Sequence, residues 1–456
     1  MLKHLPRKKI LLAMGDALLI SIAYFASPYL RFGLFIEEYI QPTLLGTLVF
    51  TFIYIFTFYM TDLYDFDIPF SSARYLFRYF VGFSVATTAV VIAFYFLPSL
   101  KTGRVVFAMT AAKIVVFTYA WRIGLEWAFR SFFERPRKIL IVGAGRAGMT
   151  IYRLIKDNKG FDVVGFIDDE RTSGVVNSPE ILGDFTVLDE MVTHHKVDSI
   201  VITITHPRDP ELLKCVLHSK MEGVQVYDMP GFYEEVTGKV PVEFLSDLWF
   251  VNTPILGVKR SFYNHRVKRM LDITCSLMCI IATLPVMVII AAAIKLESRG
   301  PVFYRQKREG LYGKTFDLVK FRSMRQDAEK EGAVWAVEND PRVTRVGRII
   351  RKLRLDEIPQ VWNVLKGEMS FIGPRPERPE FIKRLKTKIP YYSLRDSVKP
   401  GITGWAQVNY PYGSSEKDAL EKLKYDFYYI KNVTPVLDFH ILVRTIKVAI
   451  FGKGSR

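Results

Sequence analysis

Four long apolar stretches occupy the first part of the chain, before about residue 125. They lie near Ile10–Ala26, Leu44–Met60, Tyr79–Leu97 and Val105–Tyr119. Each is about long enough to cross a hydrocarbon core of roughly 30 Å. The first stretch shows no small-residue cleavage pattern and three more follow it, so we do not expect a cleaved signal peptide. The pattern predicts a four-helix transmembrane bundle over residues 1–130.

Basic residues flank these stretches unevenly. They are concentrated before the first stretch, in the second loop and after the fourth stretch. Because loops rich in Lys and Arg stay on the cytoplasmic side of a membrane, we expect both ends of the bundle to face the cytoplasm. The concentrated residues are Lys3, Arg7, Lys8, Lys9, Arg74, Arg78, Arg122, Arg130, Arg135, Arg137 and Lys138, against Arg31, Lys101 and Arg104 in the other loops.

Short apolar runs alternate with helical patterns from residue 137 onward. The first run, "RKILIV", is followed by Gly143, Gly145 and Gly148 in G-x-G-x-x-G spacing. After the next strand candidate comes Asp168, where a ribose-binding acid would fall. Two more buried-strand candidates complete the pattern of a Rossmann-like, doubly wound α/β domain over residues 137–255. Glycines in this spacing either cradle a phosphate or form a tight turn, and both interpretations stay open.

A fifth apolar stretch, residues 271–296, is also long enough to span a membrane. Pro285 lies in its middle, where proline removes a backbone hydrogen bond and kinks a helix. Both flanks are strongly basic, so both are expected on the cytoplasmic side. A re-entrant helix broken at Pro285 meets this requirement, and a straight crossing is the alternative. The basic flanking residues are Arg266, Lys268, Arg269, Lys295, Arg299, Arg305, Lys307 and Arg308.

Composition agrees with a membrane protein of two or three units. The chain has 456 residues, half of them hydrophobic, and its mean hydropathy is +0.14. The formal net charge of +17 suits nucleic acid, anionic lipid or phosphorylated substrates. Membrane content favours the last two, and nothing beyond charge supports nucleic acid. Cys215, Cys275 and Cys279 form neither a disulfide framework nor a zinc spacing, which indicates a reducing, cytosol-facing protein.

The last third of the chain is rich in residues that suit phosphate chemistry. Guanidinium groups match phosphate oxygens two at a time, and an arginine between two prolines loses less entropy on binding. Any one of these cations alone is more typical of a solvated surface. Their clustering around Asp356 and Glu357 favours a phosphate site. The candidates are Lys320, Arg322, Arg342, Arg345, Arg348 and Arg375.

The adjacent acids Asp356 and Glu357 allow two interpretations. Acids in the first turn of a helix are stabilised by the helix dipole, which would explain them structurally. Alternatively they are catalytic, and adjacent helical residues point in different directions, which suits two different tasks. Apolar residues follow at helical spacing and predict a stripe that faces either the core or the membrane surface. The stripe consists of Ile358, Val361, Trp362 and Leu365.

Longer motifs show a resemblance to a known family. They include "KFRSM", "NDPRVTRVGR", "LDEIPQVWNVLKGEMSFIGPRPE" and "KPGITGWAQVN". These motifs resemble the bacterial sugar transferases, also called polyprenyl-phosphate hexose-1-phosphate transferases or monotopic phosphoglycosyl transferases. The match covers residues 265–456, the expected catalytic domain, which should be mainly α. The four spans and the α/β domain further resemble the large subclass of the family.

The resemblance implies an activity and a location. Members transfer hexose 1-phosphate from a UDP-hexose to undecaprenyl (polyprenyl) phosphate, release UMP, and start exopolysaccharide, capsule or O-antigen synthesis. The resemblance assigns Asp356 as the nucleophile that forms a covalent intermediate and Glu357 as a ligand of Mg²⁺. It also implies a multi-pass protein of the cytoplasmic membrane, with the catalytic domain facing the cytoplasm in contact with membrane lipid, and a homodimer.

The matched motifs add further substrate-binding candidates, namely Gln360, Asn363, Glu377, Trp405 and Gln407. Two positions depart from the pattern of relatives. Arg354 stands where many have Ser or Thr, so the side-chain oxygen that would cap the following helix is absent. Leu284 precedes Pro285 where smaller relatives often have Ser. Sugar recognition depends on pocket geometry, so we assign no particular hexose.

Two other functions compete with this interpretation. A membrane-anchored, NAD-dependent nucleotide-sugar dehydratase or epimerase would also combine spans with a G-x-G-x-x-G domain. It would need a Tyr-x-x-x-Lys pair near the nicotinamide, and the one such spacing, Tyr152 and Lys156, directly follows the glycine loop. A non-enzymatic scaffold is the other alternative, and the intact acid pair and basic residues argue against it.

Overall fold

The computed structural model describes residues 7–32, 44–66, 69–97, 102–132, 135–168, 181–204, 210–259, 261–325, 341–411, 413 and 415–451. The chain forms two compact units, Met1–Arg135 and Pro136–Arg456. The first unit corresponds to the predicted bundle. The second contains both the α/β domain and the C-terminal part, so the predicted boundary between residues 255 and 265 stays a prediction.

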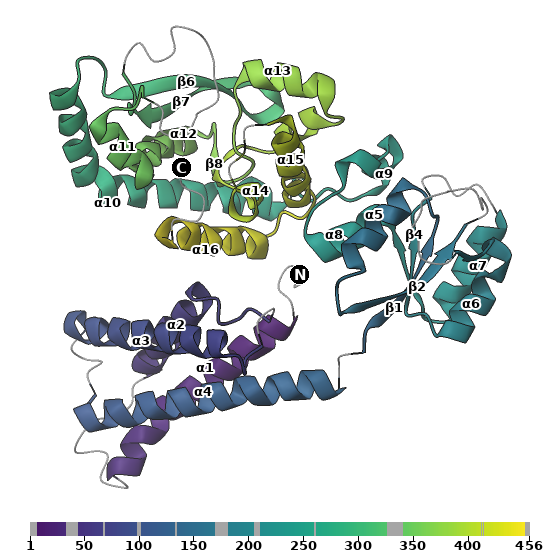
Figure 1. Cartoon of the computed structure of the whole chain (residues 1–456). Helices are drawn as coiled ribbons and strands as arrows, with labels where there is room; N and C mark the ends of the chain where they lie inside the picture. The colour runs from purple at the N-terminus through teal and green to yellow at the C-terminus, as the bar shows by residue number, and fades with distance from the viewer. Residues whose placement is uncertain are drawn as a thin grey trace. The chain divides into compact units, whose positions relative to one another are not determined.

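The first unit contains the four predicted apolar helices (Figure 1). Within the described residues, α1, α3 and α4 are long and apolar enough to cross a membrane, and α2 is a shorter apolar helix of 17 residues. Together with α10 of the second unit, this makes the chain a membrane protein. The bounds are Arg7–Phe32 for α1, Leu44–Met60 for α2, Ala73–Phe96 for α3 and Arg104–Phe132 for α4.

The sequence analysis counted Arg122 among the basic residues that follow the fourth apolar stretch. In the structure, Arg122 lies inside the bundle. Helix α4 continues well past the predicted end at Tyr119, which places Arg122 among the neighbouring helices. Its guanidinium donates two hydrogen bonds of 2.7 Å to the carboxylate of Asp16 and one of 2.9 Å to the hydroxyl of Tyr75. A buried charge must be paired in this way, and both members of the pair are fully buried.

The second unit begins with a five-stranded parallel sheet in the order β3-β2-β1-β4-β5. Alternate residues of β1 point to opposite faces. Ile139 and Ile141 pack with α5 and α8, and Leu140 and Val142 pack with α6 and α7, so helices cover both faces (Figure 1). The strands are Arg137–Val142, Phe161–Ile167, Ile181–Gly183, Ser199–Ile202 and Gln225–Asp228, and the helices are Arg146–Ile155 (α5), Leu188–His195 (α6), Pro210–Met221 (α7) and Met229–Thr237 (α8).

Helix α10, Lys268–Glu297, contains the fifth apolar stretch. Its ribbon turns sharply part-way along in Figure 1, and Pro285 lies inside the helix. Near its start, Asp272 accepts hydrogen bonds of 3.0 Å from the hydroxyl of Ser370 and from the backbone N–H of Phe371. These bonds attach the first half of α10 to strand β8. The structure therefore agrees with a bend, while the re-entrant path stays a prediction.

The C-terminal part is mainly helical, with two small sheets. An antiparallel hairpin joins β6, Phe303–Glu309, to β7, Thr315–Phe321, and a parallel pair joins β8, Ser370–Ile372, to β9, Gly401–Thr403. The helices are Asp247–Asn252 (α9), Arg345–Lys352 (α11), Leu355–Gln360 (η7, a 3₁₀ helix), Val361–Lys366 (α12), Pro379–Lys388 (α13), Tyr392–Ser397 (η8, also 3₁₀), Trp405–Asn409 (α14), Glu416–Lys431 (α15) and Pro435–Phe451 (α16).

Candidate active site

The acid pair lies in the first turn of η7, as the structural interpretation predicted, while the catalytic interpretation stays a prediction. Arg354 precedes the helix with φ of 55°, in the left-handed region that non-glycine residues adopt rarely. It makes no side-chain capping bond, as the sequence predicted. Instead, the backbone N–H of Glu357 donates to the carbonyl of Arg354 at 3.3 Å.

The predicted apolar stripe after the acids is divided between the interior and the surface, so whether it contacts the core or the membrane stays a prediction. The chain is a 3₁₀ helix up to Gln360 and becomes an α-helix only at Val361. Because a 3₁₀ helix has three residues per turn, the inward positions are spaced differently from those of an α-helix. Val361 and Val364 are buried, whereas Trp362 is exposed.

Glu357 is held by two cations from other elements. Lys320 of β7 donates to Oε1 of Glu357 at 2.9 Å, and Arg375, in the loop after β8, donates to the same oxygen at 2.7 Å. Burial by itself would raise the pKa of Glu357. The charges and hydrogen bonds of Arg375 and Lys320 outweigh that effect and hold the pKa well below its ordinary value. Glu357 is therefore a permanent anion.

Asp356 has a different environment, although it is the adjacent residue. Its side chain is buried, and no described residue donates a hydrogen bond to its carboxylate. Burial raises the pKa of Asp356, the charge of Lys320 lowers it, and Glu357 raises it again. A desolvated carboxylate without hydrogen bonds keeps its lone pairs available, which is the condition for a nucleophile.

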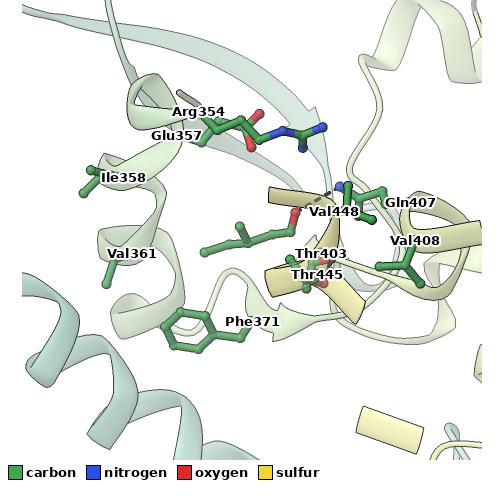
Figure 2. Close-up of a pocket in the computed structure, with 11 residues that line it drawn as sticks. Arg354, Glu357, Ile358, Val361, Phe371, Thr403, Gln407, Val408, Thr445 and Val448 are labelled. Carbon is green, nitrogen blue, oxygen red and sulfur yellow. Dashed lines mark hydrogen bonds between the residues drawn. The ribbon is translucent and has the colours of Figure 1, made fainter. Parts of the chain in front are cut away.

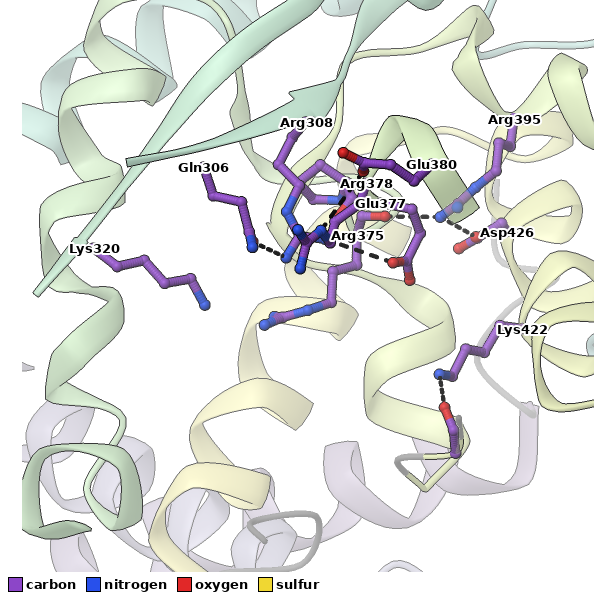
Figure 3. A network of polar contacts seen from close by, with 12 residues as sticks. Gln306, Arg308, Lys320, Arg375, Glu377, Arg378, Glu380, Arg395, Lys422 and Asp426 are labelled. Atoms are coloured by element: carbon purple, nitrogen blue, oxygen red, sulfur yellow. Dashed lines mark hydrogen bonds and ion pairs between the residues drawn. The ribbon is translucent and has the colours of Figure 1, made fainter. Parts of the chain in front are cut away.

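Two arginines outside the predicted site residues, the half-buried Arg308 and the buried Arg395, hold the Arg375 loop in place (Figure 3). Arg308 of β6 donates to the carbonyl of Pro376 at 3.0 Å and lies 3.6 Å from the carboxylate of Glu377. Arg395 of η8 donates to the carbonyl of Arg375 at 2.8 Å and pairs with Asp426 at 3.0 Å. Glu377 therefore belongs to the support of the loop. The sequence analysis did not identify Arg308 and Arg395 as site residues, because both are far along the chain from Asp356 and Glu357.

Three predicted substrate-binding residues bond within the protein instead. Arg322 donates to the carbonyls of Ser298 and Arg299 at 2.9 and 3.0 Å and so caps α10. The amide of Asn363 bonds the backbone of β7. The indole of Trp405 donates to the carbonyl of Gly238 at 3.0 Å. These bonds give the three residues a structural role, and their assignment to substrate binding stays a prediction.

The remaining predicted residues divide into two groups. Arg345 and Arg348 are exposed on α11, and Arg342 is half-buried just before that helix. Gln360 is buried, with its amide nitrogen lacking a partner in the described part of the chain, whereas Gln407 lines a cavity beside Glu357. No bound substrate tests these assignments, and they stay predictions.

The glycine loop after β1 is explained largely by packing. Gly143 has φ of +105°, and a Cβ on Gly148 would lie 2.0 Å from the carbonyl oxygen of Gly143. Asp168 accepts a hydrogen bond of 2.6 Å from the backbone N–H of Ala144. The carboxylate expected on a ribose thus holds the loop itself. Around Gly145, in contrast, an added Cβ would meet open space, so a ligand at the start of α5 stays a prediction.

A cavity of about 240 Å³ lies beside the acid pair (Figure 2). Arg354 and Glu357 lie together at one end of it. The rest of the wall is mostly apolar and comes from η7, α12, β8, β9, α14 and α16. The lining residues are Arg354, Glu357, Ile358, Val361, Phe371, Ile402, Thr403, Gln407, Val408, Thr445 and Val448.

The donor set suits Mg²⁺ only together with a substrate. Among the described residues, no group of three His, Cys, Asp or Glu side chains could hold a metal. Both cation contacts of Glu357 fall on Oε1, so Oε2 takes part in neither. Mg²⁺ accepts one or two carboxylates plus substrate phosphates, and Glu357 together with the phosphates of a bound substrate would offer that arrangement.

Comparisons with known proteins agree with this geometry. The family described as "Bacterial sugar transferase" matches residues 263–452, and the one described as "CoA-binding domain" matches residues 59–230. An N-acetylgalactosaminephosphotransferase that acts on UDP-N-acetylgalactosamine and undecaprenyl phosphate, from Aeromonas hydrophila, is 42% identical over 51% of this chain and 54% of its own length. This chain thus aligns with about half of that relative.

Two other relatives align over most of their length. A UDP-glucose:undecaprenyl-phosphate glucose-1-phosphate transferase of Escherichia coli (strain K12) is 34% identical over 78% of this chain and 76% of its own. An undecaprenyl-phosphate galactose phosphotransferase of Salmonella typhimurium is 29% identical over 77% and 80%. These matches identify a membrane-associated sugar-phosphate transferase. The chain belongs to the bacterial sugar transferase family.

These comparisons give no support to the dehydratase or epimerase. In the structure, the ring of Tyr152 packs against Phe166 with centroids 5.9 Å apart, while Lys156 is exposed at the end of α5. The Tyr-x-x-x-Lys spacing is therefore part of an ordinary helix packing against its sheet.

Proposed function

We propose that the protein transfers hexose 1-phosphate from a UDP-hexose to undecaprenyl phosphate and releases UMP. The observation that carries this proposal is the contrast within the acid pair. Glu357 is fixed by Lys320 and Arg375, whereas Asp356 is buried and accepts no hydrogen bond from the described residues. The names of the relatives support the two substrates.

The first half of the reaction is attack by Asp356 on the phosphorus that carries the hexose. A bond forms between the Asp356 carboxylate oxygen and this phosphorus, and the anhydride bond to UMP breaks. UMP leaves with the electron pair as an anion. Lys320 and Arg375 lie next to the site, so they counter the charge that develops on the phosphate oxygens.

The second half is attack by undecaprenyl phosphate on the same phosphorus. An oxygen of the lipid phosphate forms the new anhydride bond, and the bond to Asp356 breaks, which regenerates the carboxylate. The product is an undecaprenyl diphosphate sugar. Dividing the transfer in this way means that two mutually repelling anions never have to meet each other directly.

Mg²⁺ would be held by Glu357 together with the substrate phosphates, which leaves the carboxylate of Asp356 free to attack. When bound, the ion would supply positive charge to the phosphoanhydride. The ionised state of Glu357, which Arg375 and Lys320 maintain, prepares the residue for this role.

The membrane arrangement is part of the proposal. Basic residues on both sides of α10, with the bend in its ribbon, support a re-entrant helix that enters and leaves at the cytoplasmic face. The strand order β3-β2-β1-β4-β5 and the glycine loop support a Rossmann-like domain. We place the enzyme in the cytoplasmic membrane, with the acid pair on the side where UDP-hexoses are found.

The test is an assay of UMP release by the purified full chain. A panel of UDP-hexoses is supplied with Mg²⁺, with and without undecaprenyl phosphate, and the panel also identifies the hexose. We expect turnover with both substrates, and we expect Asp356→Asn to abolish it. Asp317→Asn, which changes an exposed acid of β7, is the matched control and should remain active. Full activity of Asp356→Asn would overturn the proposal.

A further inference from the structure

The apolar wall of the cavity beside Glu357, here named the acceptor cavity, takes no part in the attack of Asp356 on the UDP-hexose. Its volume of about 240 Å³ is several times the roughly 30 Å³ that one water molecule occupies in the liquid. This leaves room for a five-carbon isoprene unit. The cavity lies between the turn that carries the acid pair and helix α16.

The wall of the acceptor cavity is suited to an apolar chain. Most of its side chains are aliphatic or aromatic, with Phe371 at the end away from Glu357 (Figure 2). The hydroxyls of Thr403 and Thr445 bond to each other at 2.7 Å, and the amide nitrogen of Gln407 donates to the carbonyl of Ile402 at 3.0 Å. The side-chain oxygen of Gln407 is a buried acceptor without a partner among the described residues. Apart from this oxygen, the polar groups of the two threonines and of the Gln407 amide nitrogen are bonded within the protein, so a hydrocarbon chain would displace none of these hydrogen bonds.

Charge separates this cavity from the site for the nucleotide. A UDP-hexose carries two phosphates and needs several cations, and Lys320, Arg375 and Arg308 are not part of the cavity wall. They lie in the polar network of Figure 3. Arg354 supplies positive charge at the end of the cavity next to Glu357. A single phosphate with an apolar tail matches a cavity of this kind.

Helix α16 connects the cavity to an apolar outer surface. Thr445 and Val448 face the cavity, while Phe439, Leu442 and Ile446 are exposed on another side of the same helix. Residues at spacings of three and four form one stripe along a helix. Exposed apolar side chains in a membrane-associated protein are expected to contact lipid. A chain held in the bilayer would thus reach the cavity along α16.

We propose that the acceptor cavity binds the first isoprene units of polyprenyl phosphate and sets the lipid phosphate against Asp356. This inference rests on the proposed function, because it assigns the second substrate of that reaction to a specific part of the site. It adds a determinant of acceptor specificity. An acceptor phosphate without an isoprenoid tail would lack this contact.

The two halves of the reaction allow a direct test with matched variants of the full chain. Val448→Phe on α16 and Val408→Phe on α14 each add volume inside the cavity from a different element. Val251→Phe makes the same change at an exposed position of α9, outside the cavity wall, and serves as the control. For each protein, we would measure UMP released from UDP-hexose without lipid, the KM for undecaprenyl phosphate, and thermal stabilisation by undecaprenyl phosphate alone.

We expect the two cavity variants to release UMP without lipid as the wild type does. Their KM for undecaprenyl phosphate should rise at least about tenfold, because the tail loses its apolar contacts. The lipid should stabilise the wild type and Val251→Phe but not the cavity variants. An intact UMP signal also shows that a variant has folded, and if one cavity variant fails to fold, the other decides.

Two results would overturn the proposal. A raised KM for UDP-hexose with an unchanged KM for the lipid would show that the cavity binds the donor. Unchanged constants for both substrates in both cavity variants would show that it binds neither. Failure of the proposed function would be seen separately, as an absence of UMP release by the wild type. Lipid stabilisation would still test the cavity in that case.

Discussion

Arg375 donates a hydrogen bond of 2.7 Å to Glu357, and this contact joins the Pro-flanked loop after β8 to the helix that carries Asp356. The same loop is held from behind by Arg308 and Arg395, which bond the carbonyls of Pro376 and Arg375. The loop after β8, with its supports on β6 and η8, therefore helps to keep Glu357 ionised beside the buried Asp356. Rigid support of this kind is what positions reactive groups for catalysis.

Replacing Arg375 by Lys should show how much this geometry contributes. Lysine keeps the charge but loses the planar guanidinium, so we expect kcat/KM for UDP-hexose to fall at least about tenfold. Arg384→Lys is the matched control, because Arg384 is exposed on α13 and pairs with Glu416. Equal activity of the two variants would mean that Arg375 acts only as a charge.

Lys320 should control the pH dependence of the first half-reaction. Its charge lowers the pKa of Asp356, so Lys320→Met should let that pKa rise. Because a protonated Asp356 cannot attack, the acidic limb of UMP release should move to higher pH. Lys314→Met, at an exposed lysine before β7, is the control. An acidic limb at the same pH in Lys320→Met and wild type would show that Lys320 does not control the pKa of Asp356.

Asp396 should make the stability of the protein depend on pH. Burial raises the pKa of Asp396 to about 7, with Arg395 opposing and Glu309 adding to the rise. The ordinary value is 3.8, so between these limits the folded protein keeps a proton that the unfolded chain has lost. Stability from this group is therefore present at low pH and falls as the pH rises towards 7.

Asp396→Asn removes that titration. We expect the variant to gain thermal stability relative to the wild type at pH 8 but not at pH 4, measured as the midpoint of thermal unfolding in detergent. Asp162→Asn, at an exposed residue of β2, provides the comparison. A gain of equal size at both pH values would contradict the assignment.

The buried ion pair of the N-terminal bundle predicts a non-additive result. Removing one member of a buried pair leaves an uncompensated charge and typically costs about 3–5 kcal/mol. Arg122→Met should therefore destabilise the protein more than the double variant Asp16→Leu, Arg122→Met, in thermal unfolding in detergent. A double variant that unfolds at a lower temperature than Arg122→Met alone would contradict this prediction.

Local pattern was enough to predict the apolar helices, the parallel sheet and the position of the acid pair in the first turn of a helix. The position of Pro285 and the glycine spacing likewise predicted a bend and a tight turn. The partners of Arg322 and Trp405 could not be predicted, because Ser298 and Gly238 meet them only in the folded chain. Arg308 and Arg395 were missed for the same reason, since they reach the Arg375 loop from β6 and η8. The change from a 3₁₀ helix to an α-helix at Val361 could not be predicted from the spacing of the apolar residues.

The proposed mechanism requires Asp356 to form a covalent bond to the sugar-bearing phosphorus. The most direct measurement is mass spectrometry of the enzyme quenched with acid after exposure to UDP-hexose and Mg²⁺ without lipid. We predict that the peptide containing Asp356 gains the mass of the hexose phosphate, and that undecaprenyl phosphate removes it. An unmodified peptide under conditions where UMP accumulates would contradict the account.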